Sequence, residues 1–395
     1  MGWRYYAQRP VSGMWLDNNV QLSDVELQWV LSAPNAGSAL IPNGLDRFPV
    51  AEDNKYTWSR FNTLLYAEED GKLEWVGVCT AANPDAQGLH LEFMGVTGLL
   101  QRIPYTDTYR RWKIDVFDVV RHLLAHARQK PDTLDIIASG NDAKIYVGDL
   151  EPPPKPRKPT RKKGETKKEF QASKRYKEWQ KKQKAWDKKY GGRKKYELLK
   201  WEAPYVGEEI DALAKETQFE YREEYRWKDG GNRQAEFKMV LDVDMVRRRD
   251  DIEFTEGVNL AKALDPKDGN DTFANRVIGL GAGEGQKMVR VNVGGADGRL
   301  YQAVYSSYKH IKDKNRLQAR VSADLKIFKS TDPEVDSVDV WDTPGMADIK
   351  SLQVGDEVKI NSAALVPPVH VWARVTRITR RPESNIVTLD LERAA

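Results

Sequence analysis

Short runs of alternating apolar and polar residues, separated by turn residues, dominate positions 1–103. Residues 20–31 contain an alternation of apolar side chains at Val25, Leu27, Trp29 and Leu31. The runs at 63–67 and 73–79 flank Glu68-Glu-Asp-Gly71, a hairpin signal because glycine adopts positive φ at low cost. With a further run at 89–93, the pattern predicts a small antiparallel barrel or sandwich.

The middle of the chain mixes helical and strand patterns. Asp115 can cap a run of apolar residues at helical spacing, which predicts a helix that ends before Pro131. Residues 207–217 and 308–328 show the same spacing. The expected strands of this region are 133–138, 219–227, 235–241, 275–280 and 287–293.

The alternating pattern returns at the C-terminal end. We expect strands at 335–341, 356–360, 369–379 and 386–391. Val354-Gly-Asp356 fits a turn that leads into a second small barrel.

Between these regions lies a segment of different character. Prolines crowd residues 151–163 and predict an extended, semi-rigid linker. Residues 166–190 then predict a lysine-rich helix that Gly191-Gly192 ends. Six positions on it, all but one of them apolar or aromatic, recur with gaps of 4, 3, 4, 3 and 4, a heptad-like stripe. The stripe consists of Ala172, Tyr176, Trp179, Gln183, Trp186 and Tyr190.

Composition narrows the class of protein. The 395 residues are 40% hydrophobic and 31% charged, which suits two to four folded domains and excludes disorder throughout. The sequence has no apolar run of about 18 residues and no secretory signal, so we expect no membrane span. The lone Cys79 cannot form an intrachain disulfide and fits assembly in a reducing cytosol.

The net charge of +4 hides an asymmetry. Residues 151–200 hold 20 Lys and Arg against 6 Asp and Glu, so this segment carries +14 and the remaining chain −10. A short basic segment therefore accompanies an acidic body.

The basic segment admits three interpretations. A docking helix would bury its aromatic stripe on a partner protein while its lysines meet an acidic surface. A nucleic-acid binder would use the lysines on phosphates and the rings on bases. A solvated insertion would do neither. The helical period of the rings favours docking, so stable nucleic-acid binding is not expected. The candidate docking residues are Tyr176, Trp179, Trp186, Tyr190, Lys181, Lys182, Lys188 and Lys189.

Motifs of catalysis or cofactor binding are weak. The glycines of 279–285 lack the Rossmann spacing and precede a strand rather than a helix, so they predict a structural turn. His122 and His126 have a metal-compatible spacing but no evident third ligand. Asp342-Thr-Pro-Gly345 has no accompanying phosphate loop and predicts another turn. We therefore expect no catalytic residue, no cofactor and no metal.

The order of several segments resembles minor tail proteins of siphophages that infect actinobacteria. The resemblance covers nearly the whole chain except about 151–196, and its order is more specific than any single motif. Its segments are Val20–Leu31 with the following Ser32-Ala-Pro-Asn-Ala-Gly, Leu91–Gly98, Ile103–Tyr105, Ile114–His122, Gly207–Lys215, Phe219–Trp227, Asn275–Gly285, Asp297–Leu300, Val354–Val358 and Arg377–Ser384.

The resemblance implies a tail-tip hub, similar to the N-terminal hub module of tail-associated proteins and to contractile-tail baseplate hubs. Such hubs are trimers with two barrel-like domains per chain. They join a hexameric distal tail ring to a threefold tip and close or line the tail tube. The implied partners are two further copies, the distal tail ring, the tape-measure protein, and a central fibre or other tip proteins. The implied location is the virion tail tip, after synthesis and assembly in the bacterial host cytoplasm. The implied roles are host attachment and genome ejection.

These observations combine into one expected architecture, a β-rich α+β protein with two antiparallel barrel-like domains flanking a mixed middle. The expected divisions are 1–103, 104–150, 151–196 (the basic insertion), 197–334 and 335–395. The leading hypothesis is a non-enzymatic hub. The alternatives are a nucleic-acid-binding protein acting through 155–200, or a cell-wall hydrolase of the tail tip for which no catalytic motif is evident.

Overall fold

The computed structural model describes residues 2–42, 56–228, 233–265, 273–283, 285–308, 311, 313–329, 335–343, 347–365 and 368–394. The protein is β-rich and of the α+β class. The chain divides into two compact units: the body (Met1–Ile103, Leu123–Asn141 and Tyr205–Ala395) and the arm unit (Pro104–His122 and Asp142–Pro204). The α-helices are α1 (Val116–Arg128), α2 (Lys167–Ala172), α3 (Lys174–Tyr190), α4 (Val206–Thr217) and α5 (Lys314–Lys329).

The N-terminal strands surround one hydrophobic core, in which Leu27, Leu65 and Trp75 are fully enclosed. The hairpin expected at 68–71 is confirmed: Asp70 and Gly71 both have positive φ, at 52° and 87°. The strands are β1 (Trp3–Gln8), β2 (Trp15–Asp17), β3 (Ser23–Val30), β4 (Ala36–Pro42), β5 (Leu64–Glu69), β6 (Lys72–Pro84) and β7 (Gly88–Gly95).

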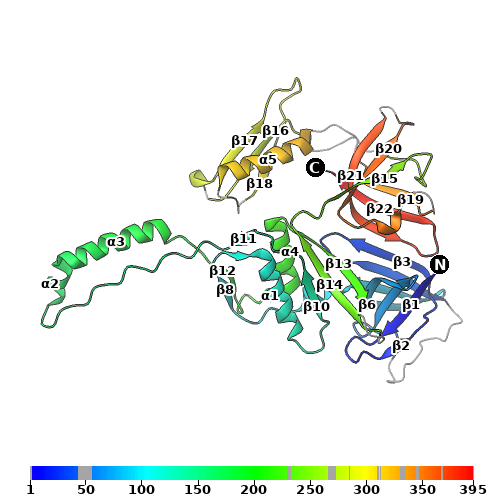
Figure 1. Cartoon of the computed structure of the whole chain (residues 1–395), viewed down its shortest axis with the longest axis horizontal. Coiled ribbons are helices and arrows are strands. Elements are labelled where there is room, and N and C mark those ends of the chain that lie inside the picture. The colour runs from blue at the N-terminus through cyan, green and yellow to red at the C-terminus, as the bar shows by residue number, and fades with distance from the viewer. Residues whose placement is uncertain are drawn as a thin grey trace. The chain divides into compact units, whose positions relative to one another are not determined.

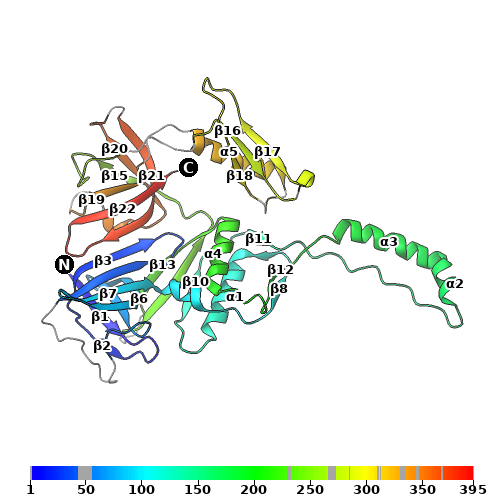
Figure 2. The ribbon, with the colours of Figure 1, turned by 180° about the vertical axis from the view of Figure 1, so that it is seen from behind.

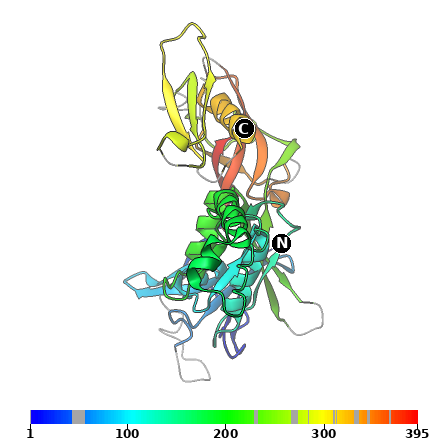
Figure 3. The ribbon, with the colours of Figure 1, turned by 90° about the vertical axis from the view of Figure 1, so that its left-hand side faces the viewer.

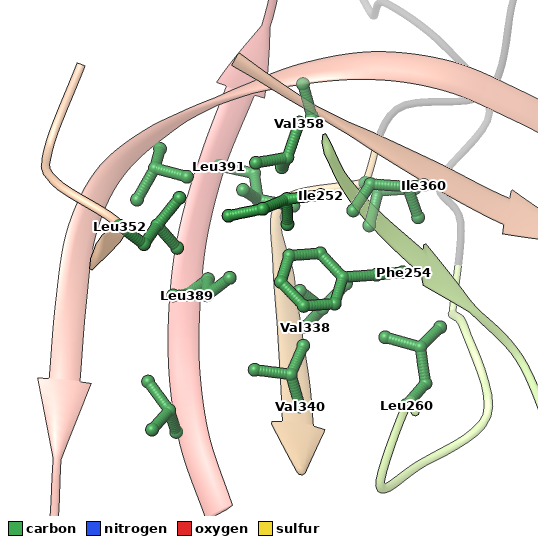
Figure 4. Close-up of a cluster of buried hydrophobic side chains, with 14 of the residues drawn as sticks. Ile252, Phe254, Leu260, Val338, Val340, Leu352, Val358, Ile360, Leu389 and Leu391 are labelled. Atoms are coloured by element: carbon green, nitrogen blue, oxygen red, sulfur yellow. The ribbon is translucent and has the colours of Figure 1, made fainter. Parts of the chain in front are cut away.

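The C-terminal strands enclose a second core of aliphatic side chains and Phe254 (Figure 4). Four of these strands were expected. The fifth, β15, pairs in parallel with β20 and was not expected from its charged sequence. At the turn before β20, Gly355 has φ 96°, and a Cβ there would meet the Met245 carbonyl. The strands are β15 (Arg247–Thr255), β19 (Ser337–Trp341), β20 (Asp356–Ser362), β21 (Val369–Arg380) and β22 (Ile386–Arg393).

The two groups of strands form one sheet rather than two closed barrels. The end of β21, Arg377–Arg380, pairs antiparallel with Leu27–Val30 of β3 (Figure 2). The resulting twelve-stranded sheet runs from β15 to β2 without closing. Each end of the chain therefore keeps its own core, while backbone hydrogen bonds join the two.

A separate small core lies in the 274–329 module, which contains β16 (Arg276–Leu280), β17 (Arg290–Gly294), β18 (Ala303–Ser307) and α5. Helix α5 covers one face of the three-stranded sheet (Figures 1 and 3). Gly279 permits this packing, since a Cβ there would overlap Val321. Helix α5 begins at Lys314, later than the expected 308. The described part of the glycine segment forms strand and turn, and Glu284 lies outside the described residues.

The rest of the body links these parts. Helix α4 packs on the 3-10 helix Val96–Arg102, where Gly207 lies against Gln101. A second three-stranded sheet contains β10 (Ile136–Ser139), β13 (Glu220–Trp227) and β14 (Ala235–Asp242). Single-turn 3-10 helices occur at Gly285–Lys287 and Ile349–Ser351. The domain boundaries expected at 103, 150, 196 and 334 stay a proposal.

Candidate docking arm

The arm unit holds the basic insertion on a short hydrogen-bonded base. Its strands are β8 (Tyr109–Arg111), β9 (Ile114–Asp115), β11 (Tyr146–Val147) and β12 (Tyr196–Leu198). Where the insertion leaves this base, Asp149 donates its backbone N–H to the Lys194 carbonyl at 2.8 Å. The backbone N–H of Lys194 in turn donates to the Asp149 carboxylate at 2.9 Å. Both strands of the insertion are therefore fixed at their root.

The expected single helix over 166–190 is wrong in one respect, because it is broken at Ser173. This residue has an extended ψ of 145°, and its side chain accepts from the Tyr176 N–H, so it caps α3. Thr166 and Glu169 form a reciprocal capping box on α2. Two consecutive N-terminal caps explain the break, since side-chain bonds to the backbone compete with a continuous helix.

The two tryptophans of the stripe contact the chain's own proline-rich segment. The indole Nε1 of Trp179 donates to the Pro156 carbonyl at 2.9 Å, and that of Trp186 donates to the Pro153 carbonyl at 2.8 Å. Both rings are half-buried. Figure 1 shows the segment that precedes α2 running alongside α3 over the length of the insertion.

The spacing of these bonds follows from two regular geometries. Seven residues of α-helix rise about 10.5 Å. Three residues of polyproline helix rise about 9.3 Å. A heptad stripe can therefore meet every third carbonyl of an antiparallel proline-rich strand, which is the register of Trp179–Trp186 on Pro156–Pro153. The insertion therefore consists of a helix and an antiparallel proline-rich segment, which the aromatic rings of the helix hold together.

Lysines of the proline-rich segment add cation–π contacts to the same rings. We call these contacts, together with the two indole hydrogen bonds, the aromatic ladder. The Lys155 ammonium lies 4.9 Å from the Trp186 ring centroid, and Lys158 lies 5.8 Å from those of Tyr176 and Trp179. At the root, the Arg193 guanidinium lies 4.8 Å from the Tyr190 ring. All four aromatic candidates thus have partners within the arm.

The four candidate lysines Lys181, Lys182, Lys188 and Lys189 are exposed. A stripe that we did not anticipate lies on the side of α3 opposite the rings, as helical geometry places it about 180° away. Its lysines follow one another in the sequence at intervals of 3, 4, 3 and 4 residues. The stripe consists of Lys174, Lys177, Lys181, Lys184 and Lys188, all exposed. The arm therefore offers a positively charged outer face while its rings face inward.

The body contains a buried carboxylate that belongs to its internal architecture. Glu223 on β13 accepts the Thr97 backbone N–H at 2.7 Å as well as the hydroxyls of Thr97 and Tyr225. Asn35 donates to the Tyr225 hydroxyl at 3.2 Å. Burial raises the pKa of Glu223. The network connects the turn after β3, the start of the 3-10 helix and β13, so it fixes how these elements meet.

Three other side chains that the sequence singled out, those of Cys79, His122 and His126, are packed within the fold. The Cys79 thiol is enclosed in the N-terminal core, and burial raises its pKa to about 12, which suppresses the thiolate. The His122 ring stacks on Tyr109 at 4.0 Å, and its Nε2 lies 2.8 Å from the Tyr105 hydroxyl. His126 is buried.

Neither a metal-holding group nor a membrane-spanning helix is found in the described part of the chain. No group of three His, Cys, Asp or Glu side chains there is placed to hold a metal ion. None of the helices in that part is both long and apolar enough to cross a bilayer.

Comparison with known proteins gives no sequence match but a clear match in fold. No family model matches the sequence, and no curated protein matches it. The 43 kDa tail protein of prophage MuSo2 from Shewanella oneidensis is similar with a TM-score of 0.56 at 8% identity, over 98% of both chains. The chain has the fold of a phage tail protein.

Two further crystal structures show the same likeness. The prophage tail protein gp18 from Listeria monocytogenes has a TM-score of 0.54 at 8% identity, over 99% of this chain and 95% of that one. The tail protein from Neisseria meningitidis has a TM-score of 0.53 at 10% identity, over 99% and 96%. The likeness spans the chains nearly end to end and therefore includes both groups of strands.

Proposed function

We propose that this protein is a structural hub of a phage tail tip and not an enzyme. The observation that carries the proposal is the end-to-end similarity in fold to three tail proteins at 95–98% coverage of their chains. The same similarity supports its presence in the virion tail.

The finer proposal is a trimeric symmetry adaptor. Each chain has two β cores joined through β3 and β21, and three copies of two similar surfaces can meet six surfaces of a hexameric ring. The partners would be the distal tail ring, the tape-measure protein, and a central fibre or other tip proteins. The hub would close or line the tube and rearrange when the tip engages a cell.

The solution mass of the purified chain tests this proposal. Light scattering at low and high salt, with and without the distal tail ring, is expected to give a trimer, or three copies bound per hexameric ring. A chain that stays monomeric and ignores the ring would contradict the adaptor.

For the arm, we propose docking on an acidic surface of a neighbouring tail protein. The rings of Tyr176, Trp179, Trp186 and Tyr190 would hold the arm in shape. The exposed Lys181, Lys182, Lys188 and Lys189 would make the contact. Support comes from the inward bonds of both indoles and the outward lysines.

Deletion of 155–190 tests the docking role. We expect weaker tail-tip assembly with the hub still folded and still trimeric. Reversing Lys181 and Lys188 to Glu is expected to weaken assembly with the arm intact, and the matched control is Gln171→Glu with Gln180→Glu. Normal assembly of both the deletion and the Lys→Glu variant would refute docking.

A nucleic-acid interaction through 155–200 is the second candidate, supported by the 20 basic residues of the segment. The inward rings leave phosphate contacts as its main source of affinity, so binding should fall steeply with salt. Fluorescence anisotropy with a 30-nucleotide oligo-dT at 50 and 200 mM salt measures this. Tight binding at 50 mM salt that falls steeply at 200 mM and disappears on removing the segment would favour this candidate over docking.

A further inference from the structure

A second concentration of positive charge lies in the 274–329 module. This module holds 11 Lys and Arg against 4 Asp and Glu, a net charge of +7. With the +14 of residues 151–200 set aside as well, the rest of the chain carries −17. The module is therefore a basic unit of an otherwise acidic body, and its field attracts polyanions.

The three-stranded sheet of this module has one covered face and one open face. Val277, Val291 and Val304 point into the core beneath α5. Successive side chains of a strand point to opposite faces, so the side chains that alternate with these valines form the other face. We call this the open face, and it consists of Arg276, Ile278, Leu280, Arg290, Asn292, Ala303, Tyr305 and Ser307.

The strand register places a tyrosine between two arginines on the open face. Ile278 pairs with Tyr305 on β18 and with Asn292 on β17, so these three side chains form one row across the sheet. Arg276 and Arg290 belong to the rows on either side of it. Tyr305 is 67% exposed, whereas Ile278 is 7% exposed. A ligand on this face would therefore meet the tyrosine ring and the guanidinium groups.

The loop before β18 adds a second exposed ring. Tyr301 is 62% exposed, and the Arg276 guanidinium lies 5.2 Å from its ring centroid. Because Arg276 belongs to the open face, this contact places the Tyr301 ring beside that face. Two exposed rings and two guanidinium groups thus occur together.

The charge of the open face has one sign. None of its side chains is acidic, and among the described residues neither Arg276 nor Arg290 forms an ion pair with a carboxylate. Asp297, in the loop that leads to β18, is paired with Arg299 and Lys329 at 3.4 and 3.7 Å. The two arginines of the face are therefore available to phosphate groups.

We propose that the open face of the 274–329 module binds single-stranded nucleic acid. Exposed tyrosine rings stack on bases of any sequence, and cations beside the rings contact the phosphates. A protein partner fits less well, since Ile278 is covered and Leu280 half-buried, whereas the centre of a protein interface is apolar and depleted of charge. This site goes beyond the proposed hub and is separate from the basic segment, whose rings face inward.

Ultraviolet crosslinking of a 30-nucleotide oligo-dT to the full chain at 50 mM salt locates the site. We expect crosslinks at Tyr301 and Tyr305, both within the tryptic peptide 300–309, identified by mass spectrometry. The yield of this peptide's crosslink against oligonucleotide concentration gives the dissociation constant of this site separately from any binding by the arm. Crosslinks confined to residues 151–200, or none, would overturn the inference.

Two variants separate stacking from charge at the same site. Tyr305→Ala should raise the dissociation constant, measured from the Tyr301 crosslink, about tenfold through the loss of one stacking ring. Tyr146→Ala, at a tyrosine of the arm unit that is 50% exposed, is its control and should change nothing. Arg290→Gln should lower the slope of log affinity against log salt by about 0.7, as for one phosphate contact to a single strand. Lys326→Gln removes the same charge from α5, on the covered side, and should leave the slope nearly unchanged.

The ligand is varied in the same way. An abasic 30-mer has the phosphates of oligo-dT without its bases, and a 30-base-pair duplex keeps its bases stacked on each other, so both should bind this site at least about tenfold more weakly. Equal affinity for the abasic strand would overturn the stacking platform. Unchanged oligo-dT binding by Tyr305→Ala, together with weaker tail-tip assembly, would assign the open face to a protein partner instead. Neither result bears on the proposed hub, whose test is the solution mass.

Discussion

The C-terminal core and the arm are stabilised by different amounts of buried apolar surface. The core encloses aliphatic side chains such as Val358 and Leu389 entirely, under strands that pair across long sequence distances. Helix α3 of the arm has no buried residue, and its rings are half-buried between helix and prolines. Burial free energy scales with the apolar area removed from water, so the core should be a cooperative unit and the arm a locally stable hairpin. Damage to one should therefore leave the other intact.

The largest effect should come from the core. Phe254→Ala removes a fully enclosed ring and should lower the free energy of unfolding by about 3–5 kcal/mol. Urea denaturation measures it, and hydrogen exchange of α3 amides should stay unchanged. Val258→Ala, at an exposed position of the same domain, is the control. Loss of α3 protection in Phe254→Ala would show that the two regions unfold together.

The converse experiment breaks the arm. Trp179→Ala with Trp186→Ala removes two indole hydrogen bonds and the ladder contact, about 2–4 kcal/mol of local stability. Hydrogen exchange should show lost protection in α3, with an unchanged urea midpoint for the body. Lys181→Ala with Lys188→Ala alters the outer face of the same helix and should leave protection nearly unchanged. If α3 stays protected without its indoles, the ladder does not hold the arm.

Within the body, Glu223 sharpens the contrast because helices α2 and α3 of the arm carry no buried carboxylate. Burial raises the pKa of Glu223, so the folded state binds its proton more tightly than the unfolded state does. Its contribution to stability is present below the unfolded pKa and is lost as pH rises through the folded pKa. Glu223→Gln cannot titrate, so its stability relative to wild type should increase between pH 4.5 and 7.5, by about 1.4 kcal/mol per unit of the pKa shift.

Urea denaturation at both pH values measures this change. Glu216→Gln, at an exposed position on α4, is the control. A stability difference between Glu223→Gln and wild type that does not depend on pH would contradict the role given to burial.

The smallest effect concerns the tip of the arm. Thr166→Ala removes the capping box of α2 and should cost about 1 kcal/mol of local stability. Exchange of α2 amides should quicken while the body keeps its urea midpoint. Thr160→Ala, at an exposed position of the proline-rich segment, should have no such effect. Equal exchange rates of the α2 amides in Thr166→Ala and Thr160→Ala would show that the capping box does not stabilise the arm.

Features set by neighbouring residues were predictable from the sequence. The Asp70-Gly71 hairpin and the strand β3 follow from turn chemistry and alternation. Asp115 accepts the Phe117 N–H at 2.9 Å at the start of α1, as expected of a cap. The aromatic stripe on α3 was visible as a heptad period. Strand β15 was not, because its inward Ile252 and Phe254 lie among charged residues and its partner β20 comes a hundred residues later.

The candidate site shows the same division. The sequence identified the rings and lysines of the arm, and it contains the lysine stripe of Lys174–Lys188 although we did not anticipate it. It could not show that the indoles would bond to Pro153 and Pro156, because that choice depends on the chain folding back on itself.

By itself, the sequence determined many of the strands, the Asp115 cap, the heptad stripe and the segregation of charge. These depend on residues within one or two turns of each other. The tertiary structure decided which surfaces meet. It joined the two groups of strands through β3 and β21, left both barrels open, turned the aromatic stripe inward and left Tyr305 exposed. Such pairings balance loop-closure entropy against buried area between distant segments, and no local pattern of residues encodes that balance.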